Sequence, residues 1–440
     1  MKKNIITGYF YIIGIVIMMI SINLLEKYSN IFILTLLILG FFVFLFGFIY
    51  SDTRKFDIII LLVLATDCFY FPIGNASYLD LLDLFTVLLL FKLFFYKRKA
   101  TNLTYKMILL SLIALAFISS INATFEFSQS YLDSIIPFRH YVVLLLFFPI
   151  VDWLDRGYEL NKYLVMVSFI ALSLFIVQYF LYTKIVFLSI PGVSVRIGLY
   201  RLHFQTLTPI LGAMVAFNSF MFTKKGLYKW FSLLVYVMAL FFTIFVNQTR
   251  TYMFGLILSG LIMFIISRTN IISKSKISIT LSLLLVILFP LYFGPVSDLV
   301  KTAFSDITTS SETYGIRQNA MKYYIELGKE HSITGYGLIN LRTKSDWLLP
   351  GYSMGYYWVD IGIYGLFFLH GILGVIWYFL VLYLLLKDTK RLINSNYVYI
   401  LAYASFGVLT ITTIGPFYFY LFPTVFCIAI TQYINRKNIN

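Results

Sequence analysis

Long apolar segments alternate with short polar segments along almost the whole chain. Fourteen segments consist mainly of apolar residues, and a run of about 20 such residues is long enough to cross a lipid bilayer. The pattern predicts an all-α polytopic membrane protein with about 14 transmembrane helices (12–14). The expected spans lie near residues 5–25, 31–50, 57–72, 78–95, 106–121, 138–154, 161–182, 205–222, 229–247, 251–267, 277–294, 357–386, 397–414 and 417–434.

The polar segments between these spans alternate in charge, and every second one is short and basic. Short cytoplasmic loops of membrane proteins carry an excess of Lys and Arg, so these segments and both chain termini are expected to be cytoplasmic. The basic residues that define this set are Lys2, Lys3, Arg54, Lys55, the KRK at 97–99, Arg156, Lys224, Lys225, Arg268, Lys274, Lys276, the KDTKR at 387–391, Arg436 and Lys437.

The opposite set of connections contains three longer segments, at 122–137, 183–204 and 295–356. A connection as long as the last one is usually functional. Apolar residues recur at helical spacing within 296–307 and again at Ile316, Ala320, Tyr323 and Leu327. We therefore expect a single integral membrane domain over residues 1–440, with a large extracytoplasmic loop at 295–356 between spans 11 and 12 that contains two amphipathic helices.

Composition supports a membrane protein and excludes two other classes. Only 12% of the residues are charged and 60% are hydrophobic, whereas soluble domains contain about 25% charged residues. The net charge of +15 is spread over short basic clusters between apolar runs, and no nucleic-acid motif accompanies it. Nucleic acid is therefore not an expected partner. Cys68 and Cys427 offer neither a disulfide framework nor metal-ligand spacing.

Arginines on the non-cytoplasmic side are the most informative polar residues. The charge rule disfavours this location, and a single arginine of this kind more often snorkels to lipid headgroups than performs chemistry. Several arginines converging from different loops would instead suit a phosphate ligand, because the planar guanidinium binds phosphate oxygens in pairs. Six arginines share this placement: Arg139, Arg196, Arg201, Arg250, Arg317 and Arg342.

Arg250 lies in the sequence NQTRTYM, where two apolar spans meet with almost no loop between them. Irregular backbone at membrane depth is tolerated only where protein buries it or where it lines a water-filled cavity. An ionisable residue at such a position indicates function by default. We therefore expect Arg250 to face a water-accessible site at the outer surface.

Four stretches resemble motifs of the O-antigen ligase and polymerase superfamily, in that family's order. They are SVRIGLYRLHFQTLTPILGAMVAF at 194–217, NQTRTYMFGLILSGLIMFI at 247–265, GIRQNAMKYYIELGKEHSITGYGLIN at 315–340 and WVDIGIYGLFFLHGILG at 358–374. Together they cover most of residues 190–375. Members of this family join glycans carried on undecaprenyl pyrophosphate at the outer face of the bacterial cytoplasmic membrane. The ligases typically carry a His-Asn pair shortly before the acidic residue of the last motif, and LPGYSMGYYWVD at 349–360 has none. The resemblance therefore favours a Wzy-type repeat-unit polymerase.

The resemblance, together with the outward placement of the arginines, indicates a set of residues that bind the pyrophosphate and the glycan. These are Arg139, Arg196, Arg201, Arg250, Arg317, Gly335 and Gly337. Arginines would stabilise the negative charge that develops on the departing pyrophosphate. No Asp-x-Asp pair occurs on the outer side, so we expect a glycosyltransferase that is independent of metal and uses no cofactor.

A general base would deprotonate the acceptor hydroxyl, contributing about 10²–10⁴-fold. His331 and Asp360 are the favoured catalytic candidates beside Arg250, although a lone loop histidine is more often merely solvated. Asp360 could equally serve as the structural partner of an arginine. The other acidic residues on the outer side are Glu312, Glu326, Glu330 and Asp346.

Two alternatives to a polymerase stay open at this stage. A ligase would transfer the finished polymer to its final acceptor, and a lipid-linked oligosaccharide flippase would have a similar number of spans. A flippase should place charges within its spans and keep its outer loops short, which is the opposite of the pattern here. The expected partners are the lipid-linked oligosaccharide, the bilayer and a chain-length regulator.

Overall fold

The computed structural model describes residues 54–66, 81–95, 105–188, 190, 192–196, 199–204, 207–223, 226–266, 312–340, 350–387, 392–393, 397–415 and 420–437, with a few single positions before residue 44. Most of the first and second expected spans lies outside these residues, as do the whole of the eleventh and the amphipathic helix expected within 296–307. The remaining eleven of the fourteen expected spans each coincide with helical structure.

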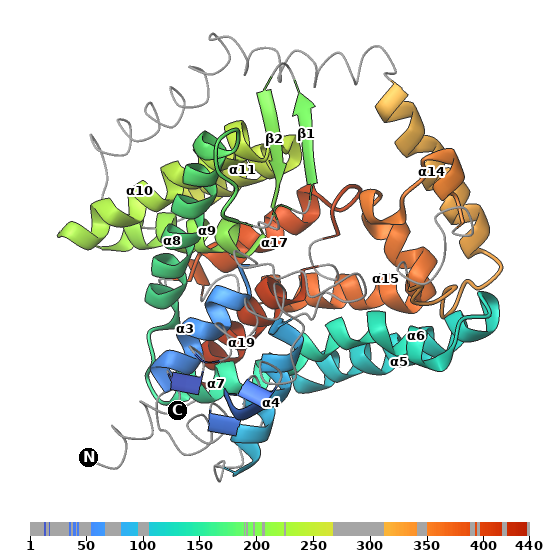
Figure 1. Cartoon of the computed structure of the whole chain (residues 1–440), viewed down its shortest axis with the longest axis horizontal. Coiled ribbons are helices and arrows are strands. Elements are labelled where there is room, and N and C mark those ends of the chain that lie inside the picture. The colour runs from blue at the N-terminus through green and yellow to red at the C-terminus, as the bar shows by residue number, and fades with distance from the viewer. Residues whose placement is uncertain are drawn as a thin grey trace.

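Helices account for most of the described chain (Figure 1). The α-helices are α3 (Arg54–Leu64), α4 (Leu81–Phe95), α5 (Lys106–Glu126), α6 (Tyr131–Phe138), α7 (Phe147–Asp155), α8 (Leu160–Leu181), α9 (Leu207–Phe222), α10 (Leu227–Phe241), α11 (Arg250–Ile266), α14 (Glu312–Gly328), α15 (Ile363–Lys387), α17 (Tyr399–Leu409) and α19 (Leu421–Lys437). Four short helices join them: the 3₁₀-helices η1 (Arg139–Leu146), η4 (Tyr352–Met354) and η5 (Trp358–Asp360), and the π-helix η2 (Phe242–Val246).

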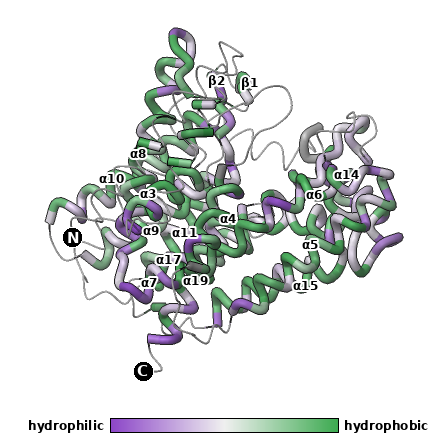
Figure 2. Tube along the Cα trace, turned by 60° about the horizontal axis from the view of Figure 1, so that its bottom comes forward, coloured by the Kyte–Doolittle hydropathy of each residue, from purple (hydrophilic) through white to green (hydrophobic). Residues whose placement is uncertain are grey.

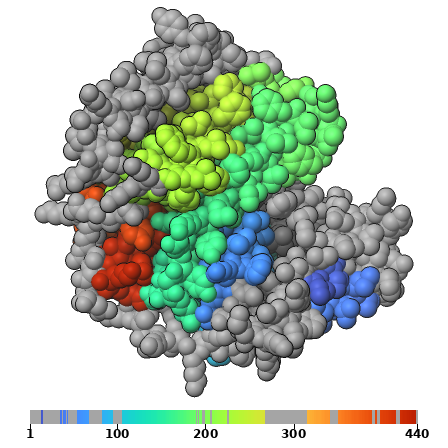
Figure 3. Space-filling model, turned by 90° about the vertical axis from the view of Figure 1, so that its left-hand side faces the viewer, coloured from blue at the N-terminus to red at the C-terminus, as the bar shows by residue number. Residues whose placement is uncertain are grey.

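Five helical segments of the described chain are long and apolar enough to cross a membrane: Lys106–Glu126, Tyr131–Asp155, Leu160–Leu181, Leu227–Val246 and Ile363–Lys387. Between 39% and 50% of the most apolar part of each is buried inside the protein, so much of the remainder is apolar surface. On the face seen in Figure 3, α3, α8 and α10 lie side by side. Their exposed side chains include Ile59, Met166, Ile170, Leu234 and Val237, an apolar surface that fits lipid rather than water.

The structure is mostly helical, as expected, and the connection between α8 and α9 adds a β-hairpin that the sequence pattern did not predict. Strand β1 (Gly192–Arg196) pairs antiparallel with β2 (Leu199–His203), with Ser194 opposite Arg201. Alternating residues on a strand point to opposite faces. In this hairpin Val193 and Val195 are exposed, whereas Leu202 is fully buried.

The helix α15 is interrupted at Gly371, whose φ of 61° and ψ of −158° are not helical. The segment that follows α14 packs into this interruption. The amides of Tyr336 and Gly337 donate to the carbonyls of Phe368 and Leu369, at 2.9 and 3.1 Å. A Cβ at Gly335 would lie 2.5 Å from the backbone N of His370, so only glycine allows this approach. The long loop is thereby joined to α15 through the backbone.

Segments distant in sequence meet near the end of α19. Arg436 near the end of the chain forms an ion pair with Asp155, and the amide of Tyr105 donates to the Gln432 side chain at 3.0 Å. Figure 2 shows hydrophilic residues along α14 and at the ends of α7 and α19, with hydrophobic residues dominating α5 and α15 between them. The described helices therefore present two polar ends.

Candidate functional site

Arg201 is fixed to the junction between α10 and α11. Its Nε donates to the carbonyl of Asn247 at 2.7 Å, and its Nη2 lies 3.3 Å from the hydroxyl of Thr249. The side chain is partly buried. Because Arg201 belongs to β2, these bonds hold the hairpin over the point where Arg250 begins α11.

The junction itself has an irregular backbone. The π-helix η2 ends with the amide of Asn247 donating to the carbonyl of Phe242 at 2.9 Å, and Gln248 has a φ of 49°. A positive φ is unfavourable for a residue with a side chain and must be held by its surroundings. Here the side-chain Nε2 of Gln248 donates to the carbonyl of Tyr200 in the hairpin at 3.0 Å. Strained backbone and π-helices concentrate at functional sites.

Three other expected site residues interact electrostatically with Arg201. Burial lowers the pKa of Arg201, nearby Asp360 raises it, and the positive charges of Arg317 and Arg250 lower it. These groups come from η5, α14 and α11, so segments far apart in the sequence meet at one place. Figure 1 shows the hairpin and α14 on the same side of α15 and α17. We call this cluster of Arg201, Arg250, Arg317 and Asp360 the arginine site.

Asp360 is the acidic member of the arginine site. It ends η5, and the next turn is anchored because the amide of Ile363 donates to the carbonyl of Ile411 at 2.7 Å. The side chain is exposed, yet the protein around it desolvates the carboxylate and raises its pKa. The guanidinium groups of Arg317 and Arg201 act in the opposite direction and lower the pKa. A carboxylate balanced in this way can take up a proton more readily than an ordinary aspartate.

Helix α14 presents Arg317 from its exposed side. The expected apolar face was partly wrong, because Ile316 is exposed while Tyr324, one position after Tyr323, is fully buried with Ala320. The Tyr324 hydroxyl lies 2.6 Å from the carbonyl of Pro350, and its ring packs 4.8 Å from that of Phe368. Because Arg317 and Tyr324 are about two helical turns apart, they lie on the same side of α14, and Arg317 extends from a helix that is anchored two turns further on.

His331 lies in a different group of side chains. Its Nε2 is 3.3 Å from a carboxylate oxygen of Glu126, and its ring packs edge-on against Tyr336. The Tyr336 hydroxyl donates to Glu330. Within the described residues, the electrostatic neighbours of Arg201 and Asp360 do not include His331.

The other expected site residues lie apart from the arginine site or outside the description. Arg139 Nε is 3.5 Å from Asp83, with His140 Nδ1 3.2 Å from the same oxygen. Arg196 pairs with Leu199 in the hairpin register, and nothing is described of its side chain. Arg342, Asp346 and the side chain of Glu312 lie outside the described residues.

The two expected glycine ligands have a packing role in the structure. Gly335 approaches the break in α15, as described above, and a Cβ at Gly337 would lie 2.2 Å from the carbonyl oxygen of Ser119 on α5. His370 beside the break is structural, because its two ring nitrogens lie 2.7 Å from the hydroxyls of Ser119 and Tyr141. The segment after α14 lies in close backbone contact with both α15 and α5. Glycine is therefore required at both positions of the Gly-x-Gly sequence.

The β-hairpin is the element that sequence reasoning missed, although a signal for it exists. Val193, Ser194 and Val195 alternate in polarity, as do Tyr200 to His203, and such alternation is typical of a half-buried strand. Comparison of the chain with known protein families and with curated proteins finds no match.

Proposed function

We propose that this protein is a glycosyltransferase that joins oligosaccharide repeat units carried on undecaprenyl pyrophosphate, at the outer face of the bacterial cytoplasmic membrane. The observation that supports this most is the arginine site, where Arg201 and Arg317 interact with the Asp360 carboxylate and Arg250 interacts with Arg201. Guanidinium groups that come together at the end of apolar helices suit a pyrophosphate whose lipid tail lies in the bilayer.

In this reaction an acceptor hydroxyl of one repeat unit attacks the anomeric carbon of another. The bond from that carbon to the pyrophosphate breaks, and the lipid pyrophosphate leaves with its electron pair. Arg201, Arg250 and Arg317 would stabilise the negative charge that grows on the leaving group, since preorganised cations act most strongly where charge develops. Asp360 would accept the proton of the attacking hydroxyl.

The test uses the purified full-length protein and the lipid-linked oligosaccharide that accumulates when the gene is deleted. Arg317→Ala should reduce polymer formation by about 10²–10³-fold, the usual effect of removing one preorganised donor to a developing anion. Lys322→Ala is the matched control, because Lys322 is an exposed cation on the same helix. Equal activity of the two variants at equal abundance would contradict the proposal.

The deletion strain separates the alternatives. Single repeat units on the lipid carrier or at the surface support the polymerase. Full-length polymer retained on the carrier would indicate a ligase, and units trapped inside the cell would indicate a flippase. A chain-length regulator would appear as an altered polymer length when the purified protein works alone.

A further inference from the structure

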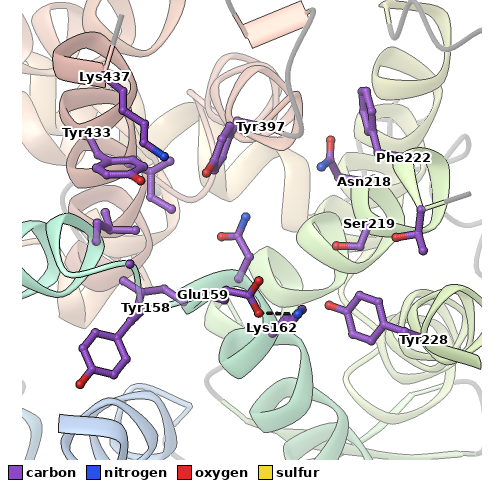
Figure 4. Close-up of a pocket in the computed structure, with 16 residues that line it drawn as sticks. Tyr158, Glu159, Lys162, Asn218, Ser219, Phe222, Tyr228, Tyr397, Tyr433 and Lys437 are labelled. Atoms are coloured by element: carbon purple, nitrogen blue, oxygen red, sulfur yellow. Dashed lines mark ion pairs between the residues drawn. The ribbon is translucent and has the colours of Figure 1, made fainter. Parts of the chain in front are cut away.

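A cavity of about 410 Å³ lies at the polar end of the protein that contains the ends of α7 and α19 (Figure 4). It is formed where α8, α10 and α17 begin and where α7, α9 and α19 end. Cavities of this size commonly hold small ligands or headgroups. The side chains used below are Glu159, Asn161, Lys162, Ser219, Tyr228 and Lys437.

Side chains, and not helix dipoles, decide the charge of this cavity. Helix beginnings carry partial positive charge and helix ends partial negative charge, and three of each meet here. Their contributions oppose one another. Lys162 and Lys437 face one lining carboxylate, Glu159, so the charged side chains leave an excess of one positive charge.

The cations can be redirected to a ligand at small cost. Lys162 pairs with Glu159 one helical turn earlier, and their side chains are 54% and 64% exposed. Exposed pairs of this kind contribute little to stability. Lys437 Nζ lies 5.1 Å from the centre of the Tyr433 ring, so its neighbour is a neutral side chain and not a carboxylate. Figure 4 shows the two ammonium groups on opposite sides of the cavity.

The neutral lining offers hydrogen-bond donors. Asn161 Oδ1 already accepts a bond from the Tyr399 hydroxyl at 3.0 Å, so its amide N–H groups are the polar atoms left for a ligand. The hydroxyls of Ser219 and Tyr228 also line the space. Two ammonium groups, an amide and several hydroxyls together match the oxygens of a phosphate group.

We propose that this cavity binds the phosphate of an anionic ligand, either a phospholipid headgroup or a soluble phosphate ester. Tyrosines at the ends of apolar helices lie at the headgroup level of a bilayer, and basic pockets between such helices bind anionic headgroups. The proposal is independent of the glycosyltransferase reaction, because the site lies at the end of the protein opposite the arginine site.

The test measures bound lipid by native mass spectrometry of the full-length protein, titrated with phosphatidylglycerol or phosphatidylcholine. The wild type should retain phosphatidylglycerol preferentially. Lys162→Gln with Lys437→Gln should reduce this preference by about tenfold, since each lysine near an anionic headgroup contributes severalfold. Lys329→Gln is the control, because Lys329 forms a similar exposed pair, with Glu326, directly after the end of α14 and is not among the residues that line the cavity. Equal thermal unfolding of all variants shows that they are folded.

Competition with glycerol phosphate identifies the source of the phosphate. Loss of phosphatidylglycerol at millimolar glycerol phosphate assigns the site to a soluble ester, and undiminished retention assigns it to the lipid; both results support the proposal. The same lipid preference in the wild type and the double variant, with no binding of glycerol phosphate to either, would overturn it.

Discussion

The two polar ends of the molecule hold their cations in different ways. At the end that holds the cavity, three basic side chains each have a carboxylate of their own: Lys162 has Glu159, Arg436 has Asp155, and Arg156 has Asp152 at 2.8 Å. At the arginine site Arg201 and Arg317 both interact with Asp360, and Arg201 is also repelled by the positive charges of Arg317 and Arg250. The paired cations are nearly neutralised without a ligand. The clustered guanidinium groups repel one another, and an anionic ligand would offset that repulsion.

This difference predicts which substitutions should destabilise the protein and which should weaken ligand binding alone. Removing one member of an ion pair leaves its partner uncompensated, and the cost grows as the pair becomes more buried. Removing one of several mutually repelling cations relieves repulsion, so the protein should stay folded while ligand binding weakens. Active sites often keep such unfavourable arrangements because function requires them.

The largest stability effect is expected at the buried pair between α3 and α4. Lys92 Nζ is 2.6 Å from Asp57, and the two side chains are 7% and 1% exposed. Lys92→Met should lower the free energy of unfolding by about 3–5 kcal/mol, because it leaves a buried carboxylate without its cation. Denaturant unfolding in detergent measures this, and the additional change Asp57→Leu should restore part of the loss. If Lys92→Met were as stable as the wild type, the proposed difference between paired and clustered cations would be contradicted.

A pyrophosphate ligand should stabilise the protein through the arginine site. Inorganic pyrophosphate at about 100 times its dissociation constant would add about 2.7 kcal/mol to the free energy of unfolding. Arg317→Ala should lose most of this gain while unfolding at the same temperature as the wild type in the absence of ligand. Lys322→Ala should keep the full gain. If pyrophosphate stabilised the wild type and both variants equally, it would bind at a site other than the arginine site.

The pH dependence of the reaction identifies its base. Desolvation raises the pKa of Asp360 above the ordinary value of 3.8, so its carboxylate is protonated at low pH and active above its raised pKa. Activity should therefore rise with pH through a midpoint above 3.8, and Asp360→Asn should abolish this rise. Arg317→Ala should shift the midpoint upward, because Arg317 lowers the pKa of Asp360. If instead His331→Gln removes the pH dependence, His331 is the base.

The smallest effects are expected at the exposed pair beside the cavity and on metal removal. Lys162→Gln should change the free energy of unfolding by no more than about 0.5 kcal/mol, since exposed pairs contribute little.

Chelation of divalent cations should leave polymer formation unchanged if arginines alone neutralise the pyrophosphate. A strong loss of activity with the chelator, reversed by Mg²⁺, would require a metal at the arginine site.

The sequence predicted the helices and the convergent residues for clear physical reasons. A long apolar segment identifies a helix that can cross a lipid bilayer. An arginine where the charge rule disfavours it, such as Arg250, indicates that its local surroundings require a positive charge. It did not predict the β-hairpin, because nearby apolar spans dominate the pattern around Val193 and Val195. The cavity was also missed, since its residues come from six chain segments whose proximity depends on packing.

The join between the long loop and α15 has a consequence for how such a protein can diverge. Its hydrogen bonds run from backbone to backbone, including those from the amides of Ile372 and Leu373 to the carbonyls of Ser332 and Ile333 at 2.8 and 3.3 Å. Apart from Gly335, Gly337 and Gly371, the residues at this join can change without removing those bonds. Mutations could therefore accumulate in the segment after α14, generation after generation, while its attachment to α15 is inherited unchanged.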